Sequence, residues 1–373
     1  MPIFDTWPQM NMENSSNRRT FLKTVAATGA GLALAQSIPA SQETPKPAGG
    51  TRLGFDNFSV RAMKWNAGQL IDYAASLKLD SLFLTDLDVY ESFEESYLRD
   101  LKKKADDHGL VIYAGSWSIC PTSKHFKNKW GTAEEHLALG IRVAKTLHSP
   151  AFRCILGMGD DRASNGGIEA RMADTIKVCR SARSQALDAG VKIAIENHAG
   201  DMQAWEIANL CEEAGKEYVG VTFDTGNSTW TMEDPLEALE ILAPYVAASA
   251  LRDSMIWPTP NGAAIQWTAI GEGVVDYKKF VPRFLELCPK IPVNVEIISG
   301  FTKDMPYFNK DYWKVWPKAR AKDFVKFDAL TRLGKKIPEH HSPDDAAEKE
   351  YQKSELERSL TYCKETLGLG LKR

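Results

Sequence analysis

The sequence lacks a cysteine framework. Its six cysteines, at positions 120, 154, 179, 211, 288 and 363, are scattered, and no two of them form a Cys-x-x-Cys pair. This spacing excludes a zinc ribbon and a small disulfide-stapled scaffold.

The sequence also lacks an excess of positive charge. The formal net charge is -3, so no basic surface is expected and nucleic acid is excluded as an expected partner. The chain has 373 residues, of which 43% are hydrophobic and 25% charged. These values are ordinary for a large globular domain with a full hydrophobic core.

A long, purely hydrophobic run is missing as well, so we expect no stable membrane span in the mature chain. The segment "NRRTFLK" (17–23) precedes a weakly apolar, glycine-containing run and the proline-containing stretch "SQETPKPAGG" (41–50). This order resembles a twin-arginine export signal. We therefore expect residues 1–40 to be that signal, 41–50 to be a linker, and the protein to be exported or periplasmic. A chance arginine pair before an amphipathic helix is the alternative, and cleavage near Ala40 stays open.

Short apolar runs alternate with amphipathic helical segments between residues 51 and 330. The runs do not alternate strictly between apolar and polar residues, which is typical of strands buried on both faces. Repeated strand–helix units of this kind predict an α/β fold, a (β/α)8 TIM barrel. An open doubly wound sheet is the alternative, but no Gly-x-Gly-x-x-Gly follows the first run. The eight runs are 52–58, 81–87, 110–117, 151–158, 191–198, 219–226, 245–253 and 291–298.

The pattern changes in residues 331–373, which read as a polar loop followed by one long helix. We expect this C-terminal helical extension to cap or flank the barrel. A contact between copies of the chain is the alternative use of the helix, so a homo-oligomer stays open.

Carboxylates follow three of the expected strands. Glu196, Asp224 and Glu296 each come at the end of an apolar run, and the functional groups of a barrel lie at the carboxyl ends of its strands. Carboxylates packed together repel one another unless a cation lies among them, and a hard divalent ion with oxygen ligands fills that role. The alternative is that each residue is solvated or caps the next helix.

Three segments resemble the xylose-isomerase-like TIM-barrel superfamily of sugar isomerases and epimerases. They are the Glu-Asn-His run at 196–198, "FDTGN" (223–227) and the glutamate of the last strand, and the resemblance covers roughly residues 52–310. It implies a divalent metal ion held by Glu, Asp, His and Glu, of which Glu196, Asp224 and Glu296 match three. Mn2+ is the expected ion, with Mg2+, Co2+ and Zn2+ as alternatives.

The fourth ligand departs from that pattern. Members of the superfamily carry a His-x-Lys-Asp motif at the end of strand seven, whereas "ASALRDS" (248–254) places Ala250 at the histidine position and Arg252 at the lysine position. We expect the amide oxygen of Gln266, on the long loop after strand seven, to complete the site, because it suits a hard ion. His198 and water are the alternatives.

The resemblance implies a sugar isomerase or epimerase that abstracts a proton next to a sugar carbonyl and passes through an enediolate. Glu196, Glu296 and His198 are the expected catalytic residues. A 3-keto-glycoside lyase using the same site is one alternative, and a non-catalytic sugar-binding barrel or partner subunit is another. A small carbohydrate is the expected ligand in each case. We expect Asn227, Arg252, His125, Trp117 and Trp230 to bind it, although both tryptophans also suit core packing.

Overall fold

The computed structural model describes residues 51–372, which belong to one compact unit. The expected export signal and linker lie outside the described residues. Within the described part of the chain, no helix is long and apolar enough to cross a membrane.

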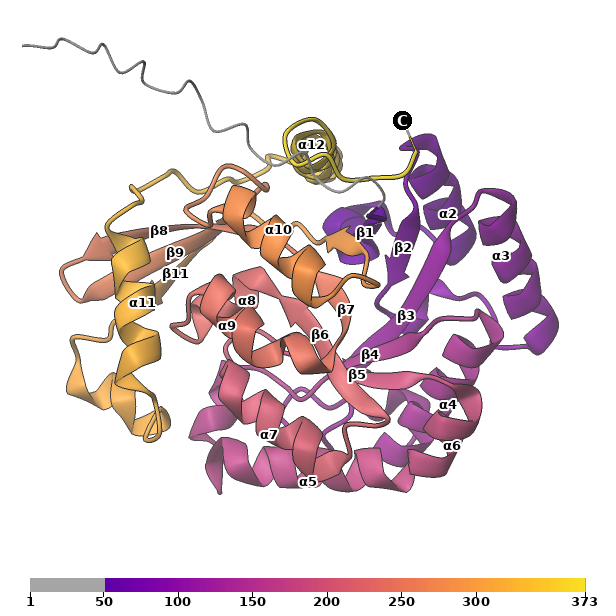
Figure 1. Ribbon diagram of the computed structural model, residues 1–373, viewed down its shortest axis with the longest axis horizontal. Coiled ribbons are helices and arrows are strands. Elements are labelled where there is room, and N and C mark those ends of the chain that lie inside the picture. The colour runs from indigo at the N-terminus through magenta and orange to yellow at the C-terminus, as the bar shows by residue number, and fades with distance from the viewer. Residues whose placement is uncertain (1–50, 373) are drawn as a thin grey trace, which may run out of the picture. The chain divides into compact units, whose positions relative to one another are not determined.

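Eight parallel strands form a nearly closed barrel (Figure 1). Neighbours along the chain pair with one another, and β10 pairs with β1. The remaining seam, between β7 and β10, is joined by one isolated parallel bridge from Leu251 to Val295. The barrel fold predicted from the eight apolar runs is therefore confirmed. The strands are β1 (Leu53–Asp56), β2 (Ser81–Leu84), β3 (Val111–Ser118), β4 (Ala151–Ile155), β5 (Lys192–Glu196), β6 (Val219–Asp224), β7 (Val246–Ala250) and β10 (Val293–Val295).

Amphipathic helices surround the barrel, and local sequence signals set their ends. The side chains of Asn66 and Thr132 accept from the backbone of the first turn of their helices in capping boxes, as these residue types favour. Gly190 ends a helix in the left-handed conformation, with φ at 66°. The α-helices between residues 51 and 300 are α2 (Ala67–Ser76), α3 (Glu95–Asp107), α4 (Ala133–Thr146), α5 (Gly167–Ser181), α6 (Arg183–Ala189), α7 (Ala204–Ala214), α8 (Thr225–Trp230), α9 (Pro235–Leu242) and α10 (Tyr277–Leu287). Short 3-10 turns are η1 (Asn57–Met63), η2 (Leu87–Val89), η3 (Asn128–Trp130), η4 (Gly159–Ala163), η5 (Ala243–Tyr245) and η6 (Lys310–Val315).

The barrel interior changes from apolar to charged along the strands. A small core cluster of Phe83, Tyr113, Ala151, Ala194 and Ala248 fills its lower part. Because side chains alternate along a strand, the residues two positions further on point to the same interior. These residues include Arg153, Glu196 and Ala250. The strands thus deliver charged groups to the carboxyl end of the barrel.

A second sheet was not predicted from the sequence. Strands β8 (Asp253–Thr259), β9 (Gly262–Thr268) and β11 (Thr302–Met305) form an antiparallel sheet in the order β11-β9-β8. The prediction of a long loop after strand seven is therefore wrong, because this segment forms the hairpin of β8 and β9. The stretch "TPNG" (259–262) is a turn signal that could have revealed it. This sheet packs a core of its own from Met232, Ile256, Ala263, Ile265, Trp267, Met305, Tyr307, Trp316 and Phe327.

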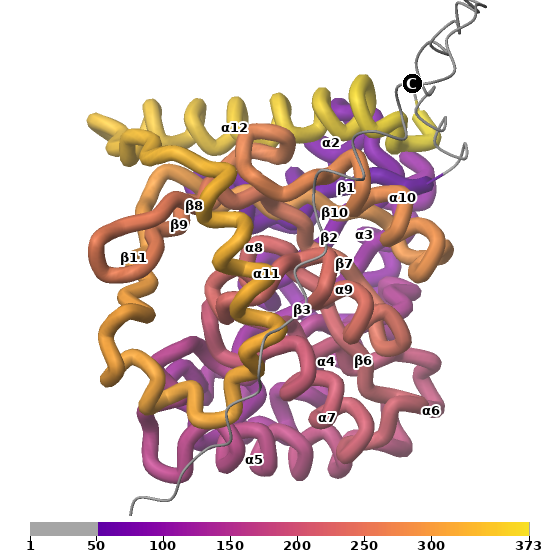
Figure 2. The backbone as a smooth tube through the Cα atoms, turned by 60° about the vertical axis from the view of Figure 1, so that its left-hand side comes forward, coloured from indigo at the N-terminus to yellow at the C-terminus, as the bar shows by residue number. Residues whose placement is uncertain are grey.

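The C-terminal region ends in a long helix, as the sequence predicts. After α11 (Ala321–Thr331) a loop leads to α12 (Asp345–Glu365), which runs across the top of the view in Figure 2. Glu355 accepts a 2.6 Å hydrogen bond from Ser299, just after β10, and the backbone N–H of Gly370 donates to Thr51 before β1. The helix α12 therefore takes the place of the helix that would follow the eighth barrel strand.

The buried histidine of α4 should make stability depend on pH. His136 is 1% exposed, its Nε2 lies 2.6 Å from Ser116 Oγ, and burial lowers its pKa from 6.5 to about 4. The neutral ring is favoured in the fold, so its contribution is full above pH 6.5 and is lost as the pH falls towards about 4. The free energy of unfolding should fall between neutral and acidic pH. In His136→Gln this fall should be smaller by about 2 to 3 kcal/mol.

Urea unfolding of both proteins at about pH 7 and about pH 4.5 measures this difference. Every other titrating group is shared by the two proteins. An identical decrease in both would show that His136 does not cause it.

Candidate functional site

A cavity of about 270 Å3 opens at the carboxyl ends of the barrel strands. Its walls combine aromatic and charged side chains. A larger groove of about 800 Å3 lies beside the outer sheet, along Trp257, Pro258 and residues 336–339. That groove contains none of the predicted site residues, so the chemistry belongs to the smaller cavity. The smaller cavity is lined by Phe58, Thr85, Asp86, Trp117, Arg153, Met158, His198, Ala199, Asn227, Trp230, Arg252, Trp267, Glu296, Ile298 and Phe301.

The three predicted carboxylates come together beneath this cavity. One oxygen each from Glu196, Asp224 and Glu296 lies within 4.8 Å of the others, so the group could hold a metal ion. All three side chains are buried. Glu296 lines the cavity, whereas Glu196 and Asp224 are not among the residues that line it.

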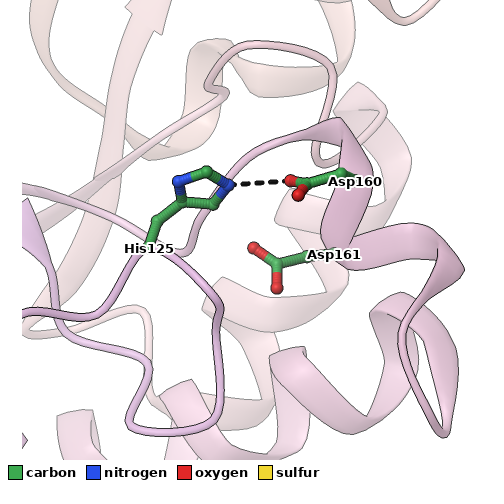
Figure 3. Close-up of side chains that lie close together, drawn as sticks. All are labelled: His125, Asp160 and Asp161. Atoms are coloured by element: carbon green, nitrogen blue, oxygen red, sulfur yellow. Dashed lines mark hydrogen bonds and ion pairs between the residues drawn. The ribbon is translucent and has the colours of Figure 1, made fainter.

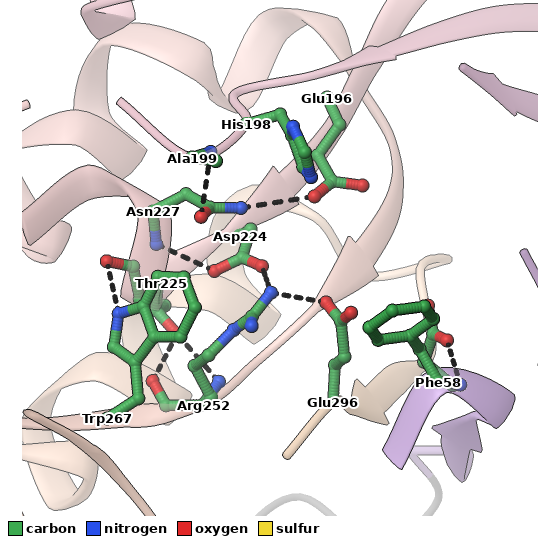
Figure 4. A network of polar contacts seen from close by, with 12 residues as sticks. Phe58, Glu196, His198, Ala199, Asp224, Thr225, Asn227, Arg252, Trp267 and Glu296 are labelled. Atoms are coloured by element: carbon green, nitrogen blue, oxygen red, sulfur yellow. Dashed lines mark hydrogen bonds and ion pairs between the residues drawn. The ribbon is translucent and has the colours of Figure 1, made fainter. Parts of the chain in front are cut away.

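Arg252 occupies the space between two of these carboxylates (Figure 4). Its Nη2 donates both to Asp224 Oδ2 and to Glu296 Oε2. The guanidinium lies over the ring of Trp267, 4.3 Å from the ring centroid. Gly226 makes room for the side chain, because a Cβ at that position would lie 2.4 Å from Arg252 Cγ. Arg252 is therefore packed into the centre, and it also forms part of the cavity wall.

A second arginine holds the third carboxylate. Arg153 Nε donates to Glu196 Oε2 over 2.5 Å, and Arg153 Nη1 donates to the carbonyl of Ser116. The other oxygen of Glu196 accepts from Asn227 Nδ2 at 3.1 Å. Arg153 was not among the residues expected from the sequence. It is the single charged residue in the strand run "AFRCIL" (151–156). A charge in a buried strand needs a partner, so its position could have indicated a site residue.

Burial and mutual repulsion limit the negative charge of the centre. Burial raises the pKa of Asp224 well above its usual range, against the attraction of Arg252. Burial, with the charge of Glu296, raises the pKa of Asp56 in the same way. Burial also acts to raise the pKa of Glu196, but the charge and hydrogen bond of Arg153 outweigh it and lower that pKa. The two guanidiniums therefore face less negative charge than the count of carboxyl groups suggests.

The residue types suit a hard divalent ion, but the atoms that would bind it are already engaged. Asp224 Oδ1 accepts from the backbone N–H of Asn227 at 2.9 Å, and its Oδ2 accepts from Arg252. Both oxygens of Glu196 are bonded as well. Among residues 51–372, only Oε1 of Glu296 in this group has no hydrogen-bond partner. The centre as folded does not fit a metal ion together with Arg252.

The structure does not bring Gln266 to the carboxylates. Gln266 lies on β9, where its Nε2 donates to the carbonyl of Pro338 at 3.1 Å and its Oε1 accepts from Thr302 at 3.3 Å. It is also absent from the cavity lining. The hairpin that replaces the expected loop holds Gln266 against the C-terminal segment.

His198 faces the cavity as a neutral imidazole. Its Nδ1 lies 2.7 Å from the carbonyl oxygen of Gly157, which can only accept, so Nδ1 carries the proton and Nε2 keeps its lone pair. Burial lowers the pKa of His198 to about 4. Trp117 packs edge-on against the ring, with the centroids 5.5 Å apart. The structure thus presents a free base at Nε2.

Four of the five residues expected to bind substrate line the cavity: Trp117, Asn227, Trp230 and Arg252. Trp230 stacks on Trp267 with ring centroids 4.1 Å apart, and Phe301 packs edge-on against both rings. These three rings form one aromatic wall. Trp267 and Phe301 were not among the residues expected from the sequence.

His125, the fifth of these residues, is not among the residues that line the cavity. Its Nε2 lies 2.7 Å from Asp160 Oδ1, with Asp161 beside them (Figure 3). These three residues are also spaced closely enough to hold a metal ion. The carboxylate of Asp161, however, already accepts from Ser123 Oγ and from the backbone of Lys124. The hydrogen bonds of a turn therefore explain why these three residues lie close together.

Comparison with known proteins identifies the fold family. The model of the xylose isomerase-like TIM barrel matches residues 71–301, more than half of the chain. An uncharacterized protein, YihM, of Escherichia coli (strain K12) is 26% identical over 98 residues, which are 26% of this chain and 30% of that protein. The match thus spans less than a third of that relative.

Solved structures agree with the family match. The IOLI protein with a zinc atom superposes with a TM-score of 0.52 at 14% identity, over 76% of this chain and 96% of that one. A D-psicose 3-epimerase crystallised with D-fructose gives 0.52 at 16% identity, over 76% and 96%. The 3-keto-D-glucoside 4-epimerase YcjR of E. coli gives 0.50 at 10% identity, over 72% and 98%. At these identities the likeness establishes the fold.

Proposed function

Because this chain belongs to the xylose isomerase-like TIM-barrel family, we propose that it is an isomerase- or epimerase-type enzyme that moves a proton on the carbon next to the carbonyl of a small carbohydrate. The observation that carries this proposal is the neutral imidazole of His198, which opens onto a cavity whose floor holds a guanidinium with unpaired donors.

The walls of the cavity suit a sugar ring. The aromatic wall of Trp230, Trp267 and Phe301 offers apolar surface for C–H groups. Arg252 and Glu296 supply polar groups for hydroxyl and carbonyl oxygens. A few convergent polar groups in an otherwise apolar pocket are typical of a small-molecule site. An unphosphorylated sugar fits the export signal that we propose for residues 1–40.

Arg252 can hold the substrate oxygen. Its Nε and Nη1 are buried and have no hydrogen-bond partner among the described residues, and buried donors left unpaired are costly. Both atoms are covered in the structure, so a carbonyl oxygen of the substrate would satisfy them once the adjoining cavity wall shifts to admit it. When the adjacent C–H bond breaks, its electron pair moves onto that oxygen, and a guanidinium already in place stabilises the negative charge.

Two groups can carry the proton, and they come from separate strands. His198 follows β5, whereas Glu296 follows β10, and β6 and β7 lie between these strands. His198 Nε2 removes the proton from carbon, and Oε1 of Glu296 is the second acceptor and donor. Delivery of the proton to the neighbouring carbon, with the hydroxyl proton of that carbon passing to the former carbonyl oxygen, gives isomerisation. Delivery of a proton held by Glu296 to the opposite face of the first carbon gives epimerisation. These steps use groups of the chain alone, because the carboxylates that would bind an ion are bonded to the arginines.

The enediolate anion that forms when the proton leaves carbon would also expel a leaving group beta to the carbonyl. Elimination is therefore a second reaction that the same site could carry out. A solved member of the fold is named as a 3-keto-D-glucoside 4-epimerase. We therefore propose keto sugars and 3-keto-glycosides as the first substrates to test.

The test is incubation of the protein with each sugar in deuterated water, followed by nuclear magnetic resonance. Deuterium at the carbon next to the carbonyl, with the sugar retained, supports the proposal. Release of the group beta to the carbonyl assigns the chain as a lyase. Sugar binding measured by calorimetry without exchange or release would assign it as a binding protein and overturn the proposed activity.

A further inference from the structure

The side chain of Arg252 is fixed in its place by the fold. Its backbone N–H donates to Thr225 Oγ1 at 3.0 Å, and its carbonyl accepts from Thr225 Oγ1 and from the hydroxyl of Tyr277 at 2.9 Å. Trp267 covers one face of the guanidinium, and Trp267 is held by a 3.0 Å hydrogen bond from its Nε1 to the carbonyl of Gly226. Hydrogen bonds thus hold the backbone of Arg252, and Trp267 holds its guanidinium.

A metal ion and this guanidinium would compete for the same oxygens. A hard divalent ion binds carboxylate oxygens at about 2.0 to 2.6 Å. The oxygens of Asp224 and Glu296 that face the centre already accept from Arg252 Nη2. An added ion would also lie beside a buried positive charge. Displacing Arg252 would leave that charge without partners, which is strongly unfavourable.

We propose that Arg252 is the permanent cation of this centre and excludes a divalent ion from Glu196, Asp224 and Glu296. The chain uses its own guanidinium at the point where three buried carboxylates would otherwise need a metal ion.

Ala250 supports this proposal independently. Its Cα pairs in register with that of Asp224 on the neighbouring strand, and it follows the interior residue Ala248 by two positions, so its side chain points into the barrel. A methyl group at this interior position offers no ligand atom. A histidine there would add an imidazole beside Asp224. The pair Ala250→His and Arg252→Ala therefore converts the centre into one that should accept an ion.

The experiment is a titration of metal-free full-length protein with Mn2+ by calorimetry, together with metal analysis after desalting. We expect no ion at this centre in the unchanged protein. The variant carrying Ala250→His and Arg252→Ala should bind a stoichiometric ion, with an affinity raised about 100-fold or more. Circular dichroism establishes that the variant is folded.

Stoichiometric Mn2+ in the unchanged protein that disappears in Asp224→Asn would overturn the proposal. A folded double variant that still binds no ion would also count against it, since Arg252 would then not be the cause of exclusion. If the double variant does not fold, the titration of the unchanged protein and of Asp224→Asn decides the matter. An ion that survives Asp224→Asn lies elsewhere and agrees with the proposal.

These readouts are metal content and heat of binding, so they do not depend on turnover. A protein that exchanges no sugar proton can still exclude the ion, and an active one can still bind it. The failure of this inference is therefore distinguishable from the failure of the proposed activity.

Discussion

Replacing His198 by alanine is expected to lower the rate of proton exchange about 10²- to 10⁴-fold, the contribution typical of a general base. The ring presents an unprotonated Nε2 to the cavity, because Nδ1 is held by the carbonyl of Gly157. Initial rates of deuterium uptake in the unchanged protein and in His198→Ala measure the loss. The variant leaves the buried carbonyl of Gly157 without this donor, which should cost about 1 to 3 kcal/mol of stability. Circular dichroism checks that the variant is folded.

His125→Ala is the matched control for this prediction. It also removes an imidazole close to a carboxylate, but His125 does not line the cavity. Its exchange rate should stay near that of the unchanged protein. Equal losses in the two variants, or full activity in His198→Ala, would refute the assignment of His198. In that case Glu296 and Asp86 would be the remaining carboxylates among the residues lining the cavity.

Replacing Arg162 by alanine is expected to lower the free energy of unfolding by about 3 to 5 kcal/mol, because it leaves a buried carboxylate without its partner. Arg162 Nη1 and Nη2 donate to the two oxygens of Glu206 at 2.8 and 3.0 Å. Both side chains are 3% exposed. Arg162 also donates to the carbonyl of Val315 and lies over Trp316, so it joins α7 to the segment before α11. Chemical denaturation of the two proteins measures the change.

Arg183→Ala is the control for the effect of burial. Arg183 donates to Glu217 over 3.1 Å, but the side chains are 55% and 49% exposed, and such surface pairs contribute about 0 to 1 kcal/mol. A loss in Arg162→Ala as small as that in Arg183→Ala would show that the buried pair does not join these segments. A larger loss confined to Arg162→Ala would show that it does.

The barrel could be predicted from sequence because it depends on repetition. Each strand is buried on both faces, so each leaves an apolar run, and the carboxyl ends of the runs locate Glu196, Asp224 and Glu296. The hairpin of β8 and β9 was missed because it interrupts this repeat after strand seven. The turn residues of the hairpin can be recognised in the sequence. Its strands, however, are buried against a separate core whose residues are far apart in the chain, so no local pattern reveals it.

The state of the carboxylates could not be read from the sequence. Arg252 was expected to bind substrate, and the structure places it both in the cavity wall and between two carboxylates. That position requires the space that Gly226 leaves for the side chain. It also requires the ring of Trp267 beside the guanidinium, and this ring comes from the hairpin that was not predicted. Similarly, Glu196 was expected to move protons, but Arg153 and Asn227 occupy both of its oxygens. Such contacts depend on tertiary packing.

The seam between β7 and β10 gives Arg252 a mechanical role as well. One bridge joins these strands, through the amide of Leu251 donating to Asn294 at 2.7 Å and the amide of Glu296 donating to Leu251 at 3.0 Å. Arg252 spans the same seam, because it links Asp224 at the end of β6 to Glu296 after β10. The charged centre is therefore one of the contacts that hold the barrel closed at this seam. The hydroxyl of Ser249, which donates to the carbonyl of Pro292 and accepts from the amide of Asn294, is another. We expect a ligand that binds Arg252 to change the local opening of this seam, and hydrogen exchange at the amides of Leu251 and Glu296 measures that change.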